Sequence, residues 1–139
     1  MKKFEILKIE ALVYERFVTV KEIDSNKILN LYFVEYGETI GECYRREIGE
    51  IIEGEISIWL GNNIKTTSLD LMFLQSIENS PHLEAVVEVK QLLDERSFYA
   101  ISSIQKKQIL IEVEEKVDLK EGDRIYLKGE LKIELKEYI

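Results

Sequence analysis

The stretch from Ile125 to Leu135 alternates apolar and polar residues almost without a break. Its odd positions are apolar or glycine, and its even positions are charged except for Tyr126. A period of two residues is typical of a strand that buries one face and exposes the other. Gly129 falls on the predicted inner face, where a glycine marks the kind of bend found at the corner of a barrel. The same alternation over 52–60 predicts a second long strand.

Shorter apolar runs separated by turn residues predict further strands. Residues 4–20 read as one long or bent strand. The turn chemistry of 24–27 leads into a strand over 28–34, which predicts a hairpin. Ser68 to Glu78 is the one segment whose apolar residues are spaced as on one face of a helix. Ser68 can cap the start of this helix, and a proline follows its end. The later strands are expected at 82–93, 98–104, 109–113 and 125–135.

These elements predict a mainly β fold, an antiparallel barrel or sandwich of about eight strands with one short helix. The inward phase of the two long strands places four residues in the core: Ile56, Ile58, Leu131 and Ile133. A chain of this length can form one domain with a sizeable core. We therefore expect residues 1–139 to form a single compact domain.

Two parts of the chain resemble each other, which raises the question of an internal duplication. Gly54–Leu60 aligns with Gly129–Leu135 without a gap, and Glu15-Arg16-Phe17 matches Glu95-Arg96-Ser97-Phe98. A duplication would give two similar β halves, 1–64 and 81–139, with the helix between them. Coincidence is the alternative, because amphipathic strands that begin with a glycine look alike in any β-rich chain.

The 139-residue chain carries a formal net charge of −8 and has a pI near 4.8. Such acidity repels phosphate backbones and argues against nucleic acid as a partner. No apolar run reaches the length of a membrane span, and no signal-peptide pattern is present, so we expect a cytoplasmic protein without a membrane contact. The lone Cys43 cannot form an internal disulfide.

Gly122 to Leu131 reads Gly-Asp-Arg-Ile-Tyr-Leu-Lys-Gly-Glu-Leu. It resembles the closing strands of a five-stranded oligonucleotide-binding barrel, which would imply an oligonucleotide or small-ligand site. Sites of this kind need aromatic platforms beside basic side chains. Lys128 and Lys132 share a face with Tyr126, but glutamates alternate with them, which favours a solvated strand face.

Residues suited to catalysis are few, and we predict no catalytic site, no cofactor and no metal. His82 and Cys43 are the only histidine and cysteine, and neither lies in a recognisable catalytic signature. A metal site would need more ligands than His82 and Glu84. Gly37 to Gly41 lacks the Lys-Ser/Thr pair of a phosphate-binding loop. An enzyme with an unrecognised carboxylate site stays open as an alternative.

The segment from Glu35 to Glu55 is the main candidate for a binding surface, because it holds seven glutamates and two arginines. Acidic side chains steer association with a basic partner, and aromatic residues framed by charge suit an interface hot spot. We therefore predict a non-catalytic protein-binding domain, such as a small inhibitor or immunity-type protein that covers a basic partner. The alternative is an oligonucleotide- or ligand-binding barrel. The predicted partner-binding residues are Tyr36, Glu38, Glu42, Tyr44, Glu47, Glu53, Glu55 and Trp59. Trp59 is expected to be the exposed anchor.

Overall fold

The computed structural model of the chain describes residues 1–35 and 46–136. Within these residues the structure is all β, since nine strands form one mixed sheet and no segment is helical. The strands are β1 (Lys2–Leu12), β2 (Glu15–Glu22), β3 (Ile28–Val34), β4 (Ile51–Thr66), β5 (Met72–Leu74), β6 (His82–Asp94), β7 (Ser97–Ile101), β8 (Ile109–Val113) and β9 (Arg124–Leu135). Their order in the sheet is β1-β2-β3-β9-β4-β8-β7-β6-β5. Additional pairings of β1 with β4 and of β9 with β6 close the bonding into rings.

The chain divides into two compact units, and the long strands β4 and β9 contribute residues to both. Of the described residues, unit 1 holds 1–35, 46–55, 77–81 and 132–136, and unit 2 holds 56–76 and 82–131. These units do not coincide with the two halves considered from the sequence, because each long strand passes from one unit to the other.

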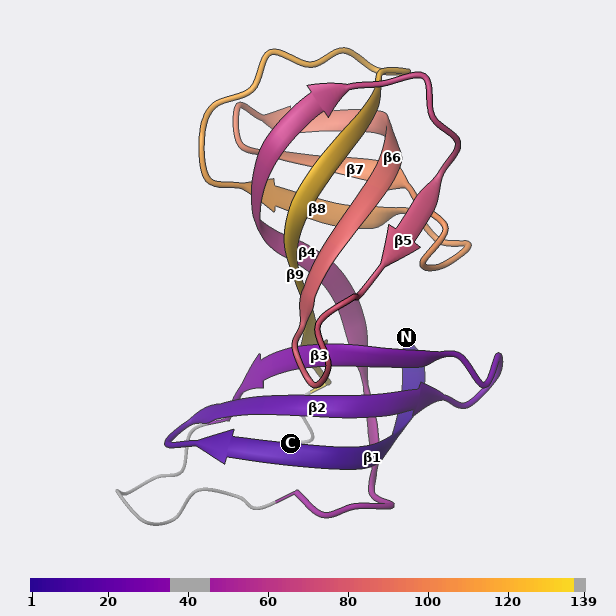
Figure 1. The fold of residues 1–139 in the computed structure, drawn as a ribbon, viewed down its shortest axis with the longest axis vertical. Helices are drawn as coiled ribbons and strands as arrows, with labels where there is room; N and C mark the ends of the chain where they lie inside the picture. The colour runs from indigo at the N-terminus through magenta and orange to yellow at the C-terminus, as the bar shows by residue number, and fades with distance from the viewer. Residues whose placement is uncertain (36–45, 137–139) are drawn as a thin grey trace. The chain divides into compact units, whose positions relative to one another are not determined.

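Unit 1 is a ring of strands in the order β1, β2, β3, β9, β4 and back to β1. Figure 1 shows β1, β2 and β3 side by side. The β1–β2, β2–β3 and β1–β4 pairs are antiparallel, whereas β3 and β9 run parallel with Tyr32 opposite Lys132. Burial alternates along β2 and β3, as expected for strands with one face on a core. The core residues are Phe4, Ile6, Val18, Val20, Leu29, Leu31, Phe33, Ile52 and Ile133.

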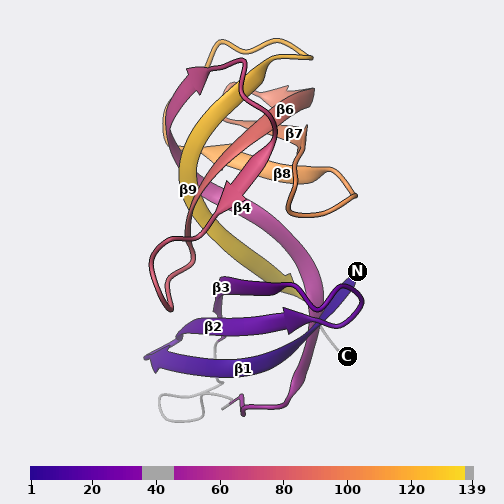
Figure 2. The ribbon, with the colours of Figure 1, turned by 45° about the vertical axis from the view of Figure 1, so that its right-hand side comes forward.

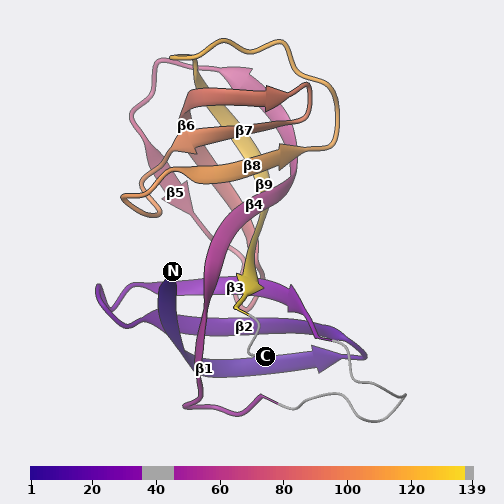
Figure 3. The ribbon, with the colours of Figure 1, turned by 180° about the vertical axis from the view of Figure 1, so that it is seen from behind.

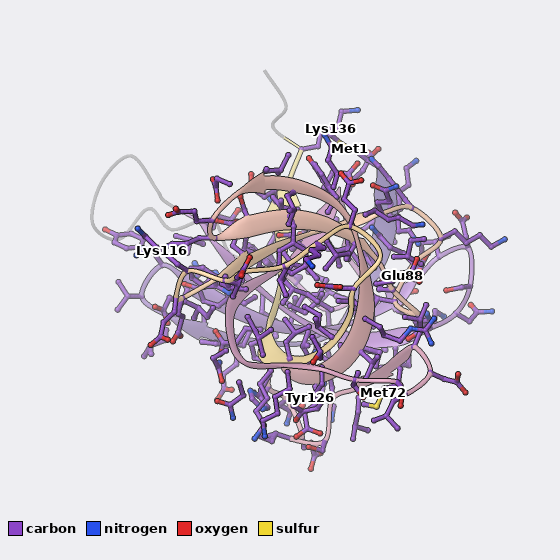
Figure 4. All side chains as sticks on the ribbon, turned by 90° about the horizontal axis from the view of Figure 1, so that it is seen from above. Met1, Met72, Glu88, Lys116, Tyr126 and Lys136 are labelled. Carbon is purple, nitrogen blue, oxygen red and sulfur yellow. The ribbon has the colours of Figure 1, made fainter. Side chains whose placement is uncertain are left out.

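Unit 2 is a ring in the order β6, β7, β8, β4, β9 and back to β6, and Figure 3 shows β6, β7 and β8 side by side. Here β4 and β8 run parallel, and the β6–β7, β7–β8 and β6–β9 pairs are antiparallel. The short β5 adds to β6. Met72 and Tyr126 both lie opposite Val86 and point to the outside of the ring (Figure 4). The fully buried hydrophobic residues of unit 2, at 0% exposure, are Ile58, Leu83, Ala85, Val86, Val87, Val89, Phe98, Ala100, Ile109, Ile111, Ile125, Leu127 and Leu131.

The two units share local irregularities as well as strand order. The register of β1 shifts after Ile6, and the register of β6 shifts after Val89. The turns before β4 and β9 each hold a glycine with a φ of 92°, Gly49 and Gly122. The backbone bonds to these turns also correspond: Ile6 N–H donates to Glu50 O and Gly49 N–H to Ile6 O, while Val89 N–H donates to Asp123 O and Gly122 N–H to Val89 O.

The strands β4 and β9 are neighbours in the sheet and lie close together in Figure 2. Gly54 and Gly129 lie at close approaches between these two strands. Both are buried, which confirms their predicted inward phase. A Cβ on Gly54 would collide with the carbonyl oxygen of Glu134, and one on Gly129 would lie 2.9 Å from Ile58 Cγ2. Only glycine allows backbones this close. When Gly49 is matched with Gly122, however, Gly54 matches Leu127, so the gap-free alignment of the two strand glycines does not follow the structural register.

The predicted core and most predicted strands are confirmed, but the helix over Ser68–Glu78 is wrong. This segment forms β5 with turns and irregular chain around it. Residues 69–74 are almost all apolar, so a helix would lack a polar face toward water, and a helix this short is marginal on its own. As a strand, Met72–Leu74 bonds to β6.

The prediction of one strand over residues 4–20 is also wrong, because the chain turns at Val13 and Tyr14 between β1 and β2. The described residues form nine strands, close to the predicted number of about eight, but the sheet is mixed rather than antiparallel. The two parallel pairs join strands that are distant in the sequence. Alternation within a strand carries no information about such pairing.

Candidate functional site

The structure describes half of the predicted partner-binding residues. Glu47 is exposed in the turn before β4, and Glu53 and Glu55 are half-buried on the part of β4 that belongs to unit 1. Trp59 lies further along β4, in unit 2. The other four lie outside the described residues: Tyr36, Glu38, Glu42 and Tyr44.

Trp59 is half-buried rather than fully exposed, and its indole nitrogen is buried. A half-buried indole contributes to the packing of its own unit, so its removal affects the fold as well as any surface it presents. Its role as a binding anchor stays a prediction. In unit 1, the Glu55 carboxylate lies 3.8 Å from the N-terminal ammonium group, an exposed pair that adds little stability.

Arg46 forms an ion-pair cluster with Glu35 and Glu50, which we call the Arg46 cluster. Arg46 Nε lies 3.1 Å from Glu35 Oε1, and Arg46 Nη1 lies 2.6 Å from Glu50 Oε2. Burial lowers the pKa of the Arg46 guanidinium, but the two carboxylates raise it by more, so the pKa lies above its ordinary value. Glu50 N–H also donates to Glu47 O at 3.1 Å, which places the exposed Glu47 beside the cluster.

The β1–β2 turn and the end of β3 border an open hollow of about 330 Å³ in unit 1. Figure 1 shows these two segments side by side. We call this feature the turn hollow, and its lining residues are Leu12, Val13, Tyr14, Glu15, Tyr32 and Val34. Leu12 is 62% exposed, Val13 71% and Val34 38%. Several exposed aliphatic side chains around one hollow mark an interaction surface, whereas single exposed ones are ordinary.

A buried arginine holds the turn that shapes this hollow. Arg16 is only 2% exposed, and its Nη1 donates hydrogen bonds to Val13 O at 2.8 Å and to Glu15 O at 3.0 Å. Val13 has a φ of 55°, a conformation that costs a β-branched residue about 1–2 kcal/mol. The bonds from Arg16 stabilise that conformation. Glu35 N–H donates to Tyr14 O at 2.9 Å and so ties the turn to the Arg46 cluster.

Four of the lining residues lie in register on the outer face of β1, β2 and β3: Leu12, Glu15, Tyr32 and Val34. Glu15 is opposite Leu12 on β1 and opposite Val34 on β3. In the next outward row Phe17 is opposite Tyr32, and their ring centroids are 5.4 Å apart. The half-buried Glu15 therefore stands between two aliphatic neighbours, with an aromatic pair in the adjoining row.

Sequence reasoning missed the turn hollow because it placed Leu12 and Val13 inside one continuous strand. The available signal was the adjacent apolar pair itself, which interrupts the alternation just before Tyr14 and Glu15. Without a glycine, proline, asparagine or aspartate at that point, nothing in the local sequence marked a turn.

Other kinds of site find little support in the part of the chain that the structure describes. No group of three or more His, Cys, Asp or Glu side chains in it could hold a metal ion. His82 is half-buried at the start of β6, and Cys43 lies outside the described residues. No helix in this part is long and apolar enough to cross a membrane.

Comparisons with protein-family models, with curated proteins and with solved structures give no match in any of the three. The function is therefore inferred from the site alone.

Proposed function

We propose that the chain is a non-catalytic, cytoplasmic protein-binding domain of the inhibitor or immunity type, which covers a basic partner protein. Its binding surface is the turn hollow together with the neighbouring Arg46 cluster and Glu47. One observation carries this proposal: an exposed aliphatic hollow contains a carboxylate, on a chain whose net charge is −8.

Charge supports a basic partner. Excess carboxylates raise the rate at which a basic protein meets this surface, and like charge disfavours acidic competitors. At the Arg46 cluster two carboxylates already occupy the one guanidinium, so the cluster adds no free positive charge. Glu47 beside it is exposed and can contribute to steering.

The hollow supports a protein as the partner, because it can contribute binding energy in addition to electrostatic steering. Binding energy in protein interfaces is concentrated in a few side chains that fill well-formed pockets. Leu12, Val13 and Val34 offer an open hollow with aliphatic walls, and a chain without a partner would leave this aliphatic surface in water. Trp59 remains a second predicted anchor, on unit 2.

For the fold, we propose that each ring is a small five-stranded barrel and that the two arose by duplication. The shared strand order supports this, as do the register shifts after Ile6 and Val89 and the matching turns at Gly49 and Gly122. Two unrelated rings would not be expected to agree at the level of single hydrogen bonds.

Oligonucleotide or ligand binding is the second candidate function. It is favoured by the Phe17–Tyr32 pair, because the outer face of the second and third strands binds ligands in oligonucleotide-binding barrels. The net charge of −8 opposes it, and so does Glu15 in the adjoining row, since both repel a phosphate backbone. Protein binding is therefore the function that the site supports best.

Affinity capture with the full chain as bait, from the cells that produce it, tests the proposal. We expect a stoichiometric basic protein that is released by moderate salt, because steering by exposed charge is screened within about 10 Å at 0.1 M salt. An inhibitor should also suppress the activity of the captured protein when the two are mixed in equal amounts.

A pair of charge-reversal baits makes this experiment specific. Glu15→Lys combined with Glu47→Lys should lose the partner. Glu115→Lys combined with Glu121→Lys should keep it, because these residues are exposed in unit 2 and the two baits carry the same net charge. Equal loss from both baits would refute the proposed surface. Retention of nuclease-sensitive material instead of a protein would favour the second candidate.

A further inference from the structure

We propose that the turn hollow receives a single arginine side chain of the basic partner. This inference rests on the proposed function and names the chemical group that the surface recognises. It follows from three features of the hollow: a carboxylate that has no ion-pair partner among the described residues, aliphatic walls, and a tyrosine ring.

The carboxylate is that of Glu15. Within residues 1–35 and 46–136, no Lys or Arg nitrogen lies within 4.0 Å of it. Its neighbours in the row, Leu12 and Val34, are aliphatic. In a sheet, a carboxylate is stabilised by an oppositely charged side chain on the neighbouring strand. Some carboxylates of the sheet have such a neighbour: Glu22 lies 2.7 Å from Lys2, Glu5 lies 3.9 Å from Lys21, and Glu84 lies 3.9 Å from Lys128.

The walls suit the rest of an arginine side chain. Long basic side chains pack their methylene groups on apolar surface while the charged end reaches a polar group. Leu12, Val13 and Val34 provide that apolar surface beside Glu15. Tyr32 also lines the hollow, and a guanidinium binds a carboxylate through two hydrogen bonds and stacks on an aromatic ring. An ammonium is more strongly hydrated and makes neither contact as well, so arginine is favoured over lysine.

Two other occupants fit less well. A leucine or phenylalanine would fill the aliphatic part, but it would remove water from the Glu15 carboxylate without replacing the lost hydrogen bonds. An anion would be repelled by Glu15 and by the net charge of −8. A guanidinium satisfies the carboxylate and covers the aliphatic residues at the same time.

The hollow is also formed before binding. Arg16 bonds to both Val13 O and Glu15 O from inside unit 1, and Glu35 N–H bonds to Tyr14 O. These bonds fix the backbone on which the lining side chains stand. Less conformational entropy is therefore lost when a partner side chain enters than would be lost at a mobile loop.

Titration of the full isotope-labelled chain with N-acetyl-arginine methylamide, followed by amide chemical shifts, tests this proposal. At millimolar concentrations of this probe, we expect changes in amide chemical shift that are confined to Leu12–Glu15 and Tyr32–Val34. The corresponding leucine and lysine probes should bind more weakly at the same concentrations. Both are acetylated on the α-nitrogen, so the lysine probe keeps its side-chain ammonium group. Glu15→Gln should weaken binding of the arginine probe about tenfold, since a charge-assisted hydrogen bond is roughly twice as strong as a neutral one.

Glu10→Gln is the matched control. Glu10 lies on the same strand as Leu12, opposite Phe17, but does not line the hollow, so this variant should bind the probe as the parent chain does. Both substitutions remove one negative charge and keep the side-chain shape. Equal spectra away from the site verify that the variants are folded.

Three results would overturn the inference: equal binding of the leucine and arginine probes, an unchanged affinity in Glu15→Gln, or shifts spread over the acidic surface. None of them would remove the proposed function, because a basic partner could still be captured through other contacts. Conversely, local arginine binding without any captured protein would refute the inhibitor role and leave a ligand site.

Discussion

Replacing Gly54 by alanine tests the close approach of β4 and β9. The added methyl group would collide with the carbonyl oxygen of Glu134 and would lie 3.0 Å from Ile133 Cγ1. The oxygen belongs to the backbone, so no side chain can rotate away to make room. The strands must separate, or the chain must deform, around this position.

The structure gives the size of the expected effect. Separation by roughly 1 Å is needed to restore an ordinary contact, and it weakens neighbouring backbone bonds such as Lys136 N–H to Glu53 O. A hydrogen bond contributes about 1 kcal/mol and overpacking costs about 1–3 kcal/mol. Alanine restricts the unfolded chain, which offsets about 0.4–1 kcal/mol. We therefore expect Gly54→Ala to lower the free energy of unfolding by about 2–3 kcal/mol.

Urea unfolding, followed by Trp59 fluorescence and by far-ultraviolet circular dichroism, measures this change. Gly49→Ala is the control, because a Cβ there meets nothing within 4 Å and tests only the backbone strain at a φ of 92°. That strain costs about 1–2 kcal/mol. A loss below about 0.5 kcal/mol for Gly54→Ala, or a smaller loss than for Gly49→Ala, would show that the strands are not packed as described.

Three further substitutions have defined outcomes. Ile58→Ala removes a fully buried side chain and should reduce stability by about 2–4 kcal/mol in a urea titration, whereas a change below about 0.5 kcal/mol would place Ile58 outside the core. Burial raises the pKa of the Glu22 carboxyl, but hydrogen bonds to Lys2 and Ser25 and the charge of Lys2 together lower it by more, so the folded pKa lies below 4.5. The wild type should therefore have a higher free energy of unfolding than Glu22→Gln, with the full difference above about pH 5 and a smaller one as the pH falls below 4.5. A difference that grows in acid would contradict this. Trp59→Ala should lower the melting temperature by several degrees because the indole is half-buried, and unchanged stability with weaker partner binding would instead make it a pure anchor.

The sequence predicts the long strands well because their alternation reports contact with a single core. Ile125–Leu135 matches β9 to within one residue, and residues 52–60 lie within β4. The predicted end of β4 at residue 60 is too early. Leu60 and Asn63 take φ values of 55° and 53°, and the strand continues past this irregularity to Thr66.

The turn hollow could not be predicted, because its cause is not local. Val13 adopts its left-handed conformation with bonds from Arg16, a side chain that is buried only once unit 1 has formed. Tyr32 and Val34 reach the hollow through the pairing of β2 with β3. Of the predicted partner-binding residues, the structure brings Glu47 next to the Arg46 cluster, while Trp59 belongs to unit 2.

The dependence of partner association on ionic strength tests the central claim most directly. The captured partner and the full chain are mixed in a stopped-flow instrument at low and at high salt, with wild type, Glu15→Gln and Glu10→Gln. We predict that association of wild type slows at least tenfold as salt rises, and that Glu15→Gln dissociates faster than both other proteins. A rate independent of salt, together with equal dissociation of all three, would contradict recognition of a basic partner at the turn hollow.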